Sequence, residues 1–165
     1  MPKLVLTNGV AMLEFARRVT LGLLEDIPED KLFYQPFPGA NHALWIIGHV
    51  AWDDNFFLTA LGGKQTDFPP AWNELFGVGS VLKPEPTAYP SLAEIRQQLD
   101  ARRYELIEWF KSMDGDQLVA PLPEDYQTFA RDHAALMTSI AWHEGLHAGQ
   151  VTVLRKALGL KPKFA

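Results

Sequence analysis

The segment from about 131 to 158 contains no proline, and its apolar residues recur at steps of three and four. These residues are Leu136, Ile140, Leu146, Val151, Leu154 and Leu158. Such spacing is typical of an α-helix that buries one face. Because a helix of this length crosses a whole domain, this segment constrains the fold more than any other part of the chain.

Three other segments show the same periodicity and are bounded by capping residues, proline or glycine. We expect helices over about 7–25, 41–61 and 91–113. Thr7-Asn8-Gly9 would cap the first helix and Asn41 the second. Ser91-Leu92-Ala93-Glu94 would form a capping box for the third, and Asp132 would cap the last. No segment shows a strand pattern or an internal repeat, which predicts an all-α four-helix bundle over 1–165 as one domain.

The connections between these segments are rich in proline. Residues 28–40 and 116–130 are predicted to be irregular, and residues 64–90 form a long connection with one short helix near 69–76. A connection this long is typical of a crossover or a lid. It would let the third helix run parallel to the second.

Composition narrows the classes of function. The chain has 165 residues, a net charge of −5, no cysteine and no run of lysine or arginine. The charge argues against nucleic acid as a partner, and the lack of cysteine excludes disulfides, zinc–thiolate sites and a cysteine nucleophile. No stretch is long and apolar enough for a membrane span, and the N-terminus lacks a secretion signal, so we expect a cytoplasmic protein.

His143 and His147 are one helical turn apart and would point the same way, so they could hold one metal ion. The alternative is a core histidine beside a surface one. The string His143-Glu144-Gly145-Leu146-His147 also matches the zincin protease pattern, in which the glutamate activates a metal-bound water. However, no His, Asp or Glu follows His147. A third ligand must therefore come from upstream.

His49 lies in the middle of the second predicted helix, after Gly48. A lone histidine on such a helix face is more often structural than a metal ligand. Together with His143 and His147, however, it would complete a set of three imidazoles from two facing helices, which is a common open metal site. Asp53, one turn later, could orient an imidazole, although we favour a surface carboxylate. His42 and His133 are expected to lie outside the site.

Glu144 is a hypothetical catalytic base, because it is adjacent to His143 but about 100° around the helix. Other charged residues are expected to face water. They are Arg17, Arg18, Arg96, Asp100, Arg102, Arg103, Glu105 and Glu108.

Two motifs identify the chain as similar to the DinB-like superfamily of metal-binding four-helix bundles. One is Trp45-Ile46-Ile47-Gly48-His49-Val50-Ala51, and the other is His143-x3-His147-Ala148-Gly149-Gln150. The Pro36-Phe37-Pro38-Gly39 turn and the Leu158-Gly159 ending also resemble the family. The resemblance covers almost the whole chain.

This resemblance implies an up-down-down-up bundle, often a homodimer, with a divalent metal held by His49, His143 and His147. Family members often carry arginine where this chain has Ala148, which leaves that arginine's role without a counterpart here. Characterised relatives include transferases and isomerases that use low-molecular-weight thiols, and others carry only the label of metal-dependent hydrolase. Despite the damage-inducible name of the family, no DNA chemistry follows.

Three neutral imidazoles leave an ion its full positive charge, which could activate water or a substrate thiol at neutral pH. Zn or Ni suits such ligands, and Fe or Cu is possible. The first hypothesis is therefore a metal-dependent enzyme that performs hydrolysis or thiol-dependent transfer or isomerisation on a small molecule. The second is a non-catalytic metal- or ligand-binding bundle, and the third is a structural bundle with core histidines.

Overall fold

The computed structural model describes residues 2–163, and these residues form helices and loops without a β-strand, apart from one isolated bridge between Pro121 and Asp132. The all-α prediction is confirmed. The four long helices are α1 (Pro2–Leu24), α2 (Ala43–Ala60), α4 (Leu92–Lys111) and α6 (His133–Ala157). The short ones are α3 (Trp72–Phe76) and α5 (Gly115–Val119), with 3-10 turns at Glu29–Lys31, Pro86–Ala88 and Glu124–Tyr126.

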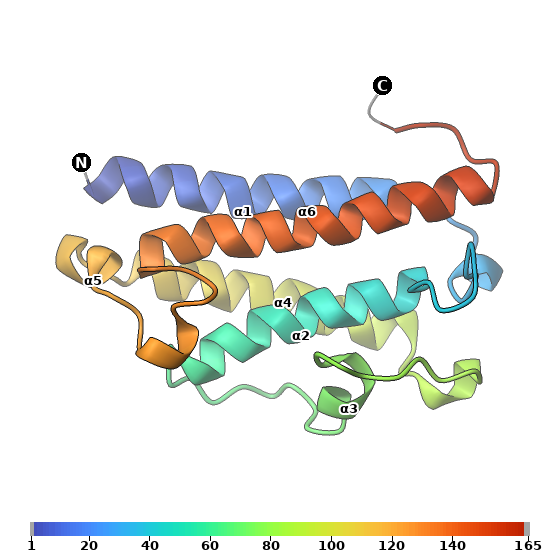
Figure 1. Ribbon diagram of the computed structural model, residues 1–165, viewed down its shortest axis with the longest axis horizontal. Coiled ribbons are helices and arrows are strands. Elements are labelled where there is room, and N and C mark those ends of the chain that lie inside the picture. The colour runs from blue at the N-terminus through green and yellow to red at the C-terminus, as the bar shows by residue number, and fades with distance from the viewer. Residues whose placement is uncertain (1, 164–165) are drawn as a thin grey trace.

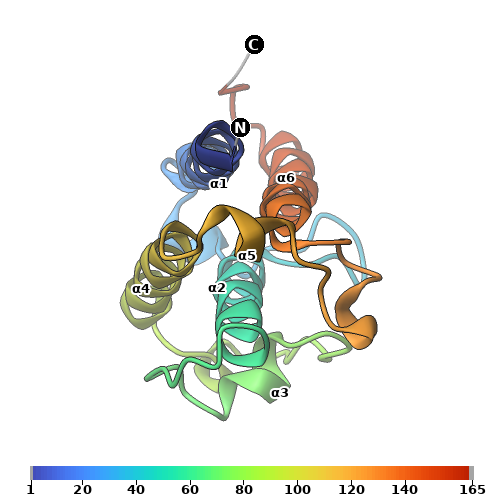
Figure 2. The same ribbon diagram turned by 90° about the vertical axis from the view of Figure 1, so that its left-hand side faces the viewer.

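The long helices lie side by side in two pairs. Helix α1 packs along α6, and α2 packs along α4, whereas α2 and α6 have much less direct contact (Figures 1 and 2). Helix α3 covers the outer side of α2, and α5 lies at the end where α6 begins. Among residues 2–163, no helix combines the length and apolar character needed to cross a bilayer.

Local side-chain chemistry explains where most helices begin. Ser91 and Glu94 form the predicted capping box of α4, and Asp132 accepts a hydrogen bond from the Ala135 N–H at 2.8 Å to cap α6. Helix α2 is capped by His42, not by Asn41, since His42 Nδ1 accepts from the Trp45 N–H at 3.1 Å. An Asp114–Gln117 capping box starts α5 inside a region predicted to be irregular.

Helix α1 begins earlier than predicted. It starts at Pro2, and residues 7–9 lie within it. The Thr7 hydroxyl donates to the Lys3 carbonyl at 2.8 Å, which is a contact inside a helix and not a cap. Gly9 has a packing role, because a Cβ there would lie 2.5 Å from Met137 Sδ.

The apolar core is divided into two clusters with a polar layer between them. On α6, for example, Leu136, Met137 and Ile140 belong to one cluster, and Val151 and Leu154 belong to the other. The side chains between them include His143, Glu144 and His147. The polar layer therefore crosses the middle of the helices.

Three arginines predicted to face water are buried. Arg17, Arg102 and Arg103 are 7%, 2% and 5% exposed, respectively. Arg102 reaches the solvent-exposed carboxylates of Asp67 and Glu105 at 2.7 and 3.1 Å. Arg17 and Arg103 instead join the polar layer. The prediction failed because a charged residue on an amphipathic helix is normally solvated, and only its tertiary partners show otherwise.

The buried cap of α2 predicts a loss of stability in acid. His42 is 3% exposed, and burial lowers its pKa to about 4, below the value of about 6.5 expected in an unfolded chain. Because the folded state resists protonation of His42, the contribution of the neutral ring to the free energy of unfolding is complete above pH 6.5. It is lost as the pH falls toward 4. We expect this loss to be on the order of 1–3 kcal/mol.

His42→Asn isolates this contribution, because asparagine can cap the helix but does not titrate. Urea unfolding of metal-free protein between pH 7 and 4 should show a shallower decline in the variant than in the wild type. Parallel declines would contradict the assignment.

Candidate metal centre

The structure brings three imidazoles together in the polar layer. His49 comes from α2, and His143 and His147 come from α6. One ring nitrogen of each lies within 4.8 Å of those of the other two. His49 and His147 are 4% and 7% exposed, while the His143 side chain is 30% exposed. Two of the three rings are therefore buried, and the ring of His143 is partly exposed to solvent.

Each imidazole has an oxygen beside its Nδ1 atom. His49 Nδ1 lies 2.6 Å from the Phe76 carbonyl, His143 Nδ1 lies 3.3 Å from Asp53 Oδ2, and His147 Nδ1 lies 3.2 Å from Gln150 Oε1. Since these oxygens accept hydrogen bonds, each neutral ring carries its proton on Nδ1. In a neutral ring of this kind Nε2 is free to bind a metal ion.

The Nε2 atoms of the two histidines on α6 face one another. His143 Nε2 and His147 Nε2 are 3.2 Å apart. Two ligands of one tetrahedral zinc ion, each about 2.05 Å from it, are separated by roughly 3.3 Å. Lone pairs held this close repel each other unless a proton or a cation lies between them. The residues therefore fit a divalent metal ion.

The surroundings keep two of the rings neutral. Burial lowers the pKa values of His49 and His147 to about 4. Burial acts in the same direction on His143, but hydrogen bonding and the charge of Asp53 outweigh it, so the pKa of His143 is raised. Neutral imidazoles are the form in which histidine binds metals. Protons would therefore compete with a metal ion more strongly at His143 than at the other two rings.

Gly48 explains how the Phe76 carbonyl reaches His49. A Cβ on Gly48 would lie 2.2 Å from the Phe76 ring, which is fully buried. Only glycine lets α3 approach α2 this closely. Trp45 and Trp52 enclose the His49 ring, with centroid distances of 4.6 and 5.8 Å and nearly parallel planes. The glycine–histidine pair is thus one structural unit.

Gly48→Ala is expected to lower the affinity for Zn²⁺ by about 10-fold or more, because a displaced Phe76 carbonyl no longer orients His49. Gly149→Ala is the matched control. It lies in α6 near His147, and a Cβ there would meet no atom within 4 Å. It should leave the affinity unchanged and stabilise the fold by about 0.5–1 kcal/mol. Titration with Zn²⁺ against a chelator measures both, and equal affinities would contradict the role of Gly48.

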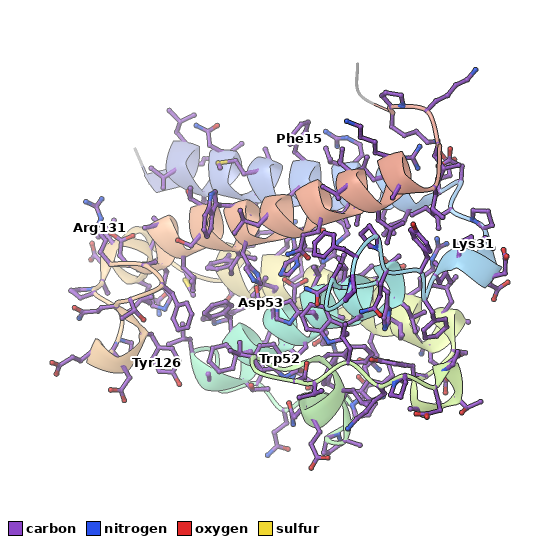
Figure 3. All side chains as sticks on the ribbon, turned by 45° about the vertical axis from the view of Figure 1, so that its right-hand side comes forward. Phe15, Lys31, Trp52, Asp53, Tyr126 and Arg131 are labelled. Carbon is purple, nitrogen blue, oxygen red and sulfur yellow. The ribbon has the colours of Figure 1, made fainter. Side chains whose placement is uncertain are left out.

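Asp53 is not the surface carboxylate that we favoured from the sequence. Its side chain is 14% exposed and faces His143, and Figure 3 shows it between α2 and α6. The position one turn after His49 was the signal for this role, since that spacing keeps both residues near the same face.

Glu144 points into the core and not toward the imidazole nitrogens. It is 1% exposed and pairs with Arg17 and Arg103. Its role as a base stays a prediction. His42 caps α2, and His133 contacts the Gln117 carbonyl at 3.0 Å, so both lie outside the group as expected.

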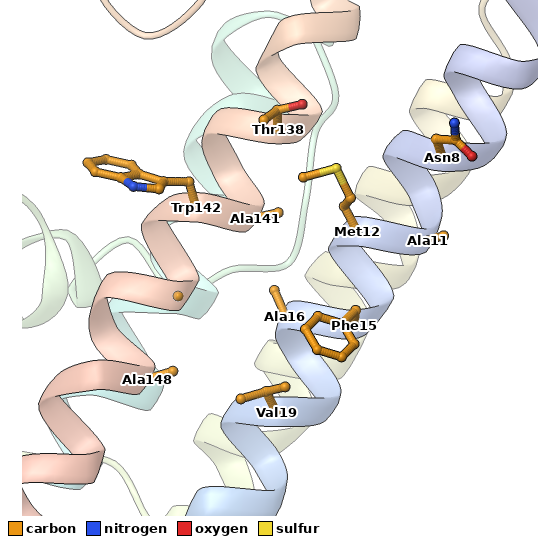
Figure 4. Close-up of a pocket in the computed structure, with 11 residues that line it drawn as sticks. Asn8, Ala11, Met12, Phe15, Ala16, Val19, Thr138, Ala141, Trp142 and Ala148 are labelled. Atoms are coloured by element: carbon orange, nitrogen blue, oxygen red, sulfur yellow. The ribbon is translucent and has the colours of Figure 1, made fainter. Parts of the chain in front are cut away.

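An apolar groove of about 760 Å³ lies elsewhere, between α1 and α6. Figure 4 shows Met12, Phe15 and Trp142 around it. Trp142 is 64% exposed although it directly precedes His143. Neighbouring residues of α6 thus serve two different faces of the helix.

Comparison with known families agrees with the motifs. The family model described as DinB superfamily matches residues 12–151, which include all three histidines. No curated protein matches the chain.

Proposed function

The chain belongs to the DinB superfamily, and from this premise we propose that it is a metal-dependent enzyme acting on a small molecule through His49, His143 and His147. The observation that carries the proposal is the group of three imidazoles with one nitrogen of each within 4.8 Å of the others, one of the rings being partly exposed. Structural zinc sites have four protein ligands, whereas catalytic ones have three and an open position. The cluster among the described residues has three members.

A divalent ion at this position would act as a Lewis acid and would make a bound water or thiol nucleophilic near neutral pH. His49, His143 and His147 would hold it, and other residues of the chain orient their rings. The Phe76 carbonyl, Asp53 and Gln150 orient the three rings, and Trp45 and Trp52 stack against the ring of His49. We propose hydrolysis or thiol-dependent transfer or isomerisation as the reaction, with Zn or Ni as the metal. The lack of cysteine in the chain means that any thiol must come with the substrate.

The test is a screen of esters and low-molecular-weight thiol adducts with wild type and His147→Ala, each assayed with and without added Zn²⁺ or Ni²⁺. Turnover that requires both the metal and His147 supports the proposal. Turnover that His147→Ala leaves unchanged would remove the metal from the reaction. Tight metal binding without turnover on any substrate favours the alternative, a non-catalytic metal-binding bundle.

We also propose that the helices form the up-down-down-up bundle of the family, with the long crossover between α2 and α4. The colour order of Figure 1 supports this, since α1 and α6 run from left to right and α2 and α4 from right to left. The 64–90 segment, which contains α3, makes the crossover.

A homodimer is proposed as the assembly, with the outer α1–α6 face as its contact surface. Between Asp132 and Arg155 the chain has one acidic or basic residue other than histidine, Glu144, and it is buried. Phe15 and Trp142 are 59% and 64% exposed on this face. Exposed aromatic side chains on a helix with few charges are typical of interface cores, where arginine is also enriched, as with Arg18 beside the Phe15 ring. Sedimentation should give a dimer for wild type and a monomer for Trp142→Glu; a monomeric wild type would contradict the proposal.

A further inference from the structure

The two helices that carry the histidines are not held together mainly by direct packing. Helix α2 packs on α4, and α6 packs on α1 (Figure 2). The small direct α2–α6 interface therefore leaves room for other contacts to help fix the distance of His49 from His143 and His147.

A buried network of four charged side chains connects all four long helices. Arg17 on α1 lies 2.9 Å from both Asp54 Oδ2 and Glu144 Oε1. Arg103 on α4 lies 2.8 Å from Asp54 Oδ1 and 2.8 Å from Glu144 Oε2. Both arginines thus reach one carboxylate on α2 and one on α6.

The network is neutral as a whole and is anchored to the backbone. None of the four side chains is more than 8% exposed. Arg17 Nη1 donates to the Leu99 carbonyl at 2.7 Å, and Arg103 Nη1 donates to the Leu13 carbonyl at 2.9 Å. Burial alone would lower the pKa of Arg103, but Asp54 and Glu144 outweigh it and raise that pKa. The guanidinium groups are planar and fixed, so they act as rigid spacers.

Each of the two carboxylates directly follows a residue in or beside the imidazole group. Asp54 follows Asp53, the partner of His143, and Glu144 follows His143 itself. A displacement of either carboxylate therefore moves the backbone that carries the imidazole group.

We infer that Arg17 and Arg103 are positioning residues for the imidazole group, acting through Asp54 and Glu144 to set the spacing between α2 and α6. This inference rests on the proposed metal binding. The arginines do not touch the imidazoles. They determine whether ring nitrogens of three histidines from two helices meet at a common point.

The test compares Co²⁺-loaded wild type with Arg103→Lys and Arg103→Met. Cobalt reports ligand geometry through its visible absorption bands, and a competing chelator gives its affinity. Lysine keeps the charge but lacks the planar fork, so both variants should change the bands and weaken Co²⁺ binding by about 10–100-fold, as outer partners of metal ligands do. Urea unfolding establishes which variants are folded.

Arg155→Met is the matched control, because Arg155 is also a buried arginine of the bundle. It is 2% exposed and binds Asp26 and the Leu23 and Lys161 carbonyls near the other end of α6. It should destabilise the fold but leave the cobalt bands unchanged and the affinity within about 2-fold. If it changes them as much as the Arg103 variants do, general loosening explains the result and the inference fails.

Glu144→Gln changes the same network with a smaller change in side-chain shape than the Arg103 variants. It keeps the shape of the side chain and removes its charge, so we expect a smaller band change in the same direction. A catalytic base would instead lose turnover with unchanged bands and affinity. Folded network variants with wild-type cobalt bands would overturn this inference alone, whereas a wild type that binds no Co²⁺ would overturn the proposed function and this inference with it.

Discussion

His49→Ala is expected to weaken Zn²⁺ binding by more than about 100-fold, beyond the 10–100-fold typical of losing an outer partner. Removal of one of three ligands leaves the pair on α6, whose nitrogens alone do not enclose an ion. Calorimetric titration of tag-free protein measures the effect directly. Wild type should bind one equivalent, and at a free Zn²⁺ concentration of 100 times Kd its unfolding free energy should rise by about 2.7 kcal/mol.

His133→Gln is the control for this experiment, since His133 is a histidine of α6 that lies outside the group and contacts Gln117 and Trp109. It should bind Zn²⁺ as wild type does. Equal loss in both variants would mean that titration reports scattered surface histidines. The His49 ring also packs against Trp45, so its removal could disturb the fold. Circular dichroism checks that His49→Ala keeps its helices.

Asp54→Asn is expected to destabilise the fold by about 3–5 kcal/mol, the usual cost of breaking a buried ion pair by neutralising one partner. Asp54 is fully buried and accepts hydrogen bonds from Arg17 and from two nitrogens of Arg103. Without its charge, two buried guanidinium groups share Glu144 alone. Urea denaturation at neutral pH measures the change in unfolding free energy.

Asp67→Asn provides the comparison, because Asp67 also pairs with a buried arginine but its own side chain is 74% exposed. An exposed partner contributes little, so we expect a change within about 1 kcal/mol. If the two substitutions cost the same, the buried Asp54 carboxylate contributes no more to stability than the exposed Asp67 carboxylate. That result would contradict the prediction.

Most of the helical fold could be predicted from the sequence because its signals are local. The proline-free segment and the Asp132 cap locate α6, and Ser91 with Glu94 locates the start of α4. The Asp114–Gln117 box of α5 is an equally local signal that the sequence analysis missed. The start of α1 at Pro2 was missed because Thr7-Asn8-Gly9 resembles a cap, although Gly9 is needed for contact with Met137.

The three histidines were predictable as a group from the spacing of His143 and His147 and from the family motif around His49. The arginine network was not, because burial of Arg17 and Arg103 depends on carboxylates more than 35 residues away in the chain. No periodicity in one helix contains that information. Similarly, the function of Gly48 depends on Phe76, which belongs to a separate short helix.

The central claim is that three imidazoles from two helices bind one divalent ion, and a crystal grown with Zn²⁺ tests it most directly. Diffraction on both sides of the zinc absorption edge should give one anomalous peak at about 2.0–2.1 Å from a ring nitrogen of each of His49, His143 and His147. No peak between α2 and α6 at saturating Zn²⁺, or a peak that excludes His49, would contradict the account.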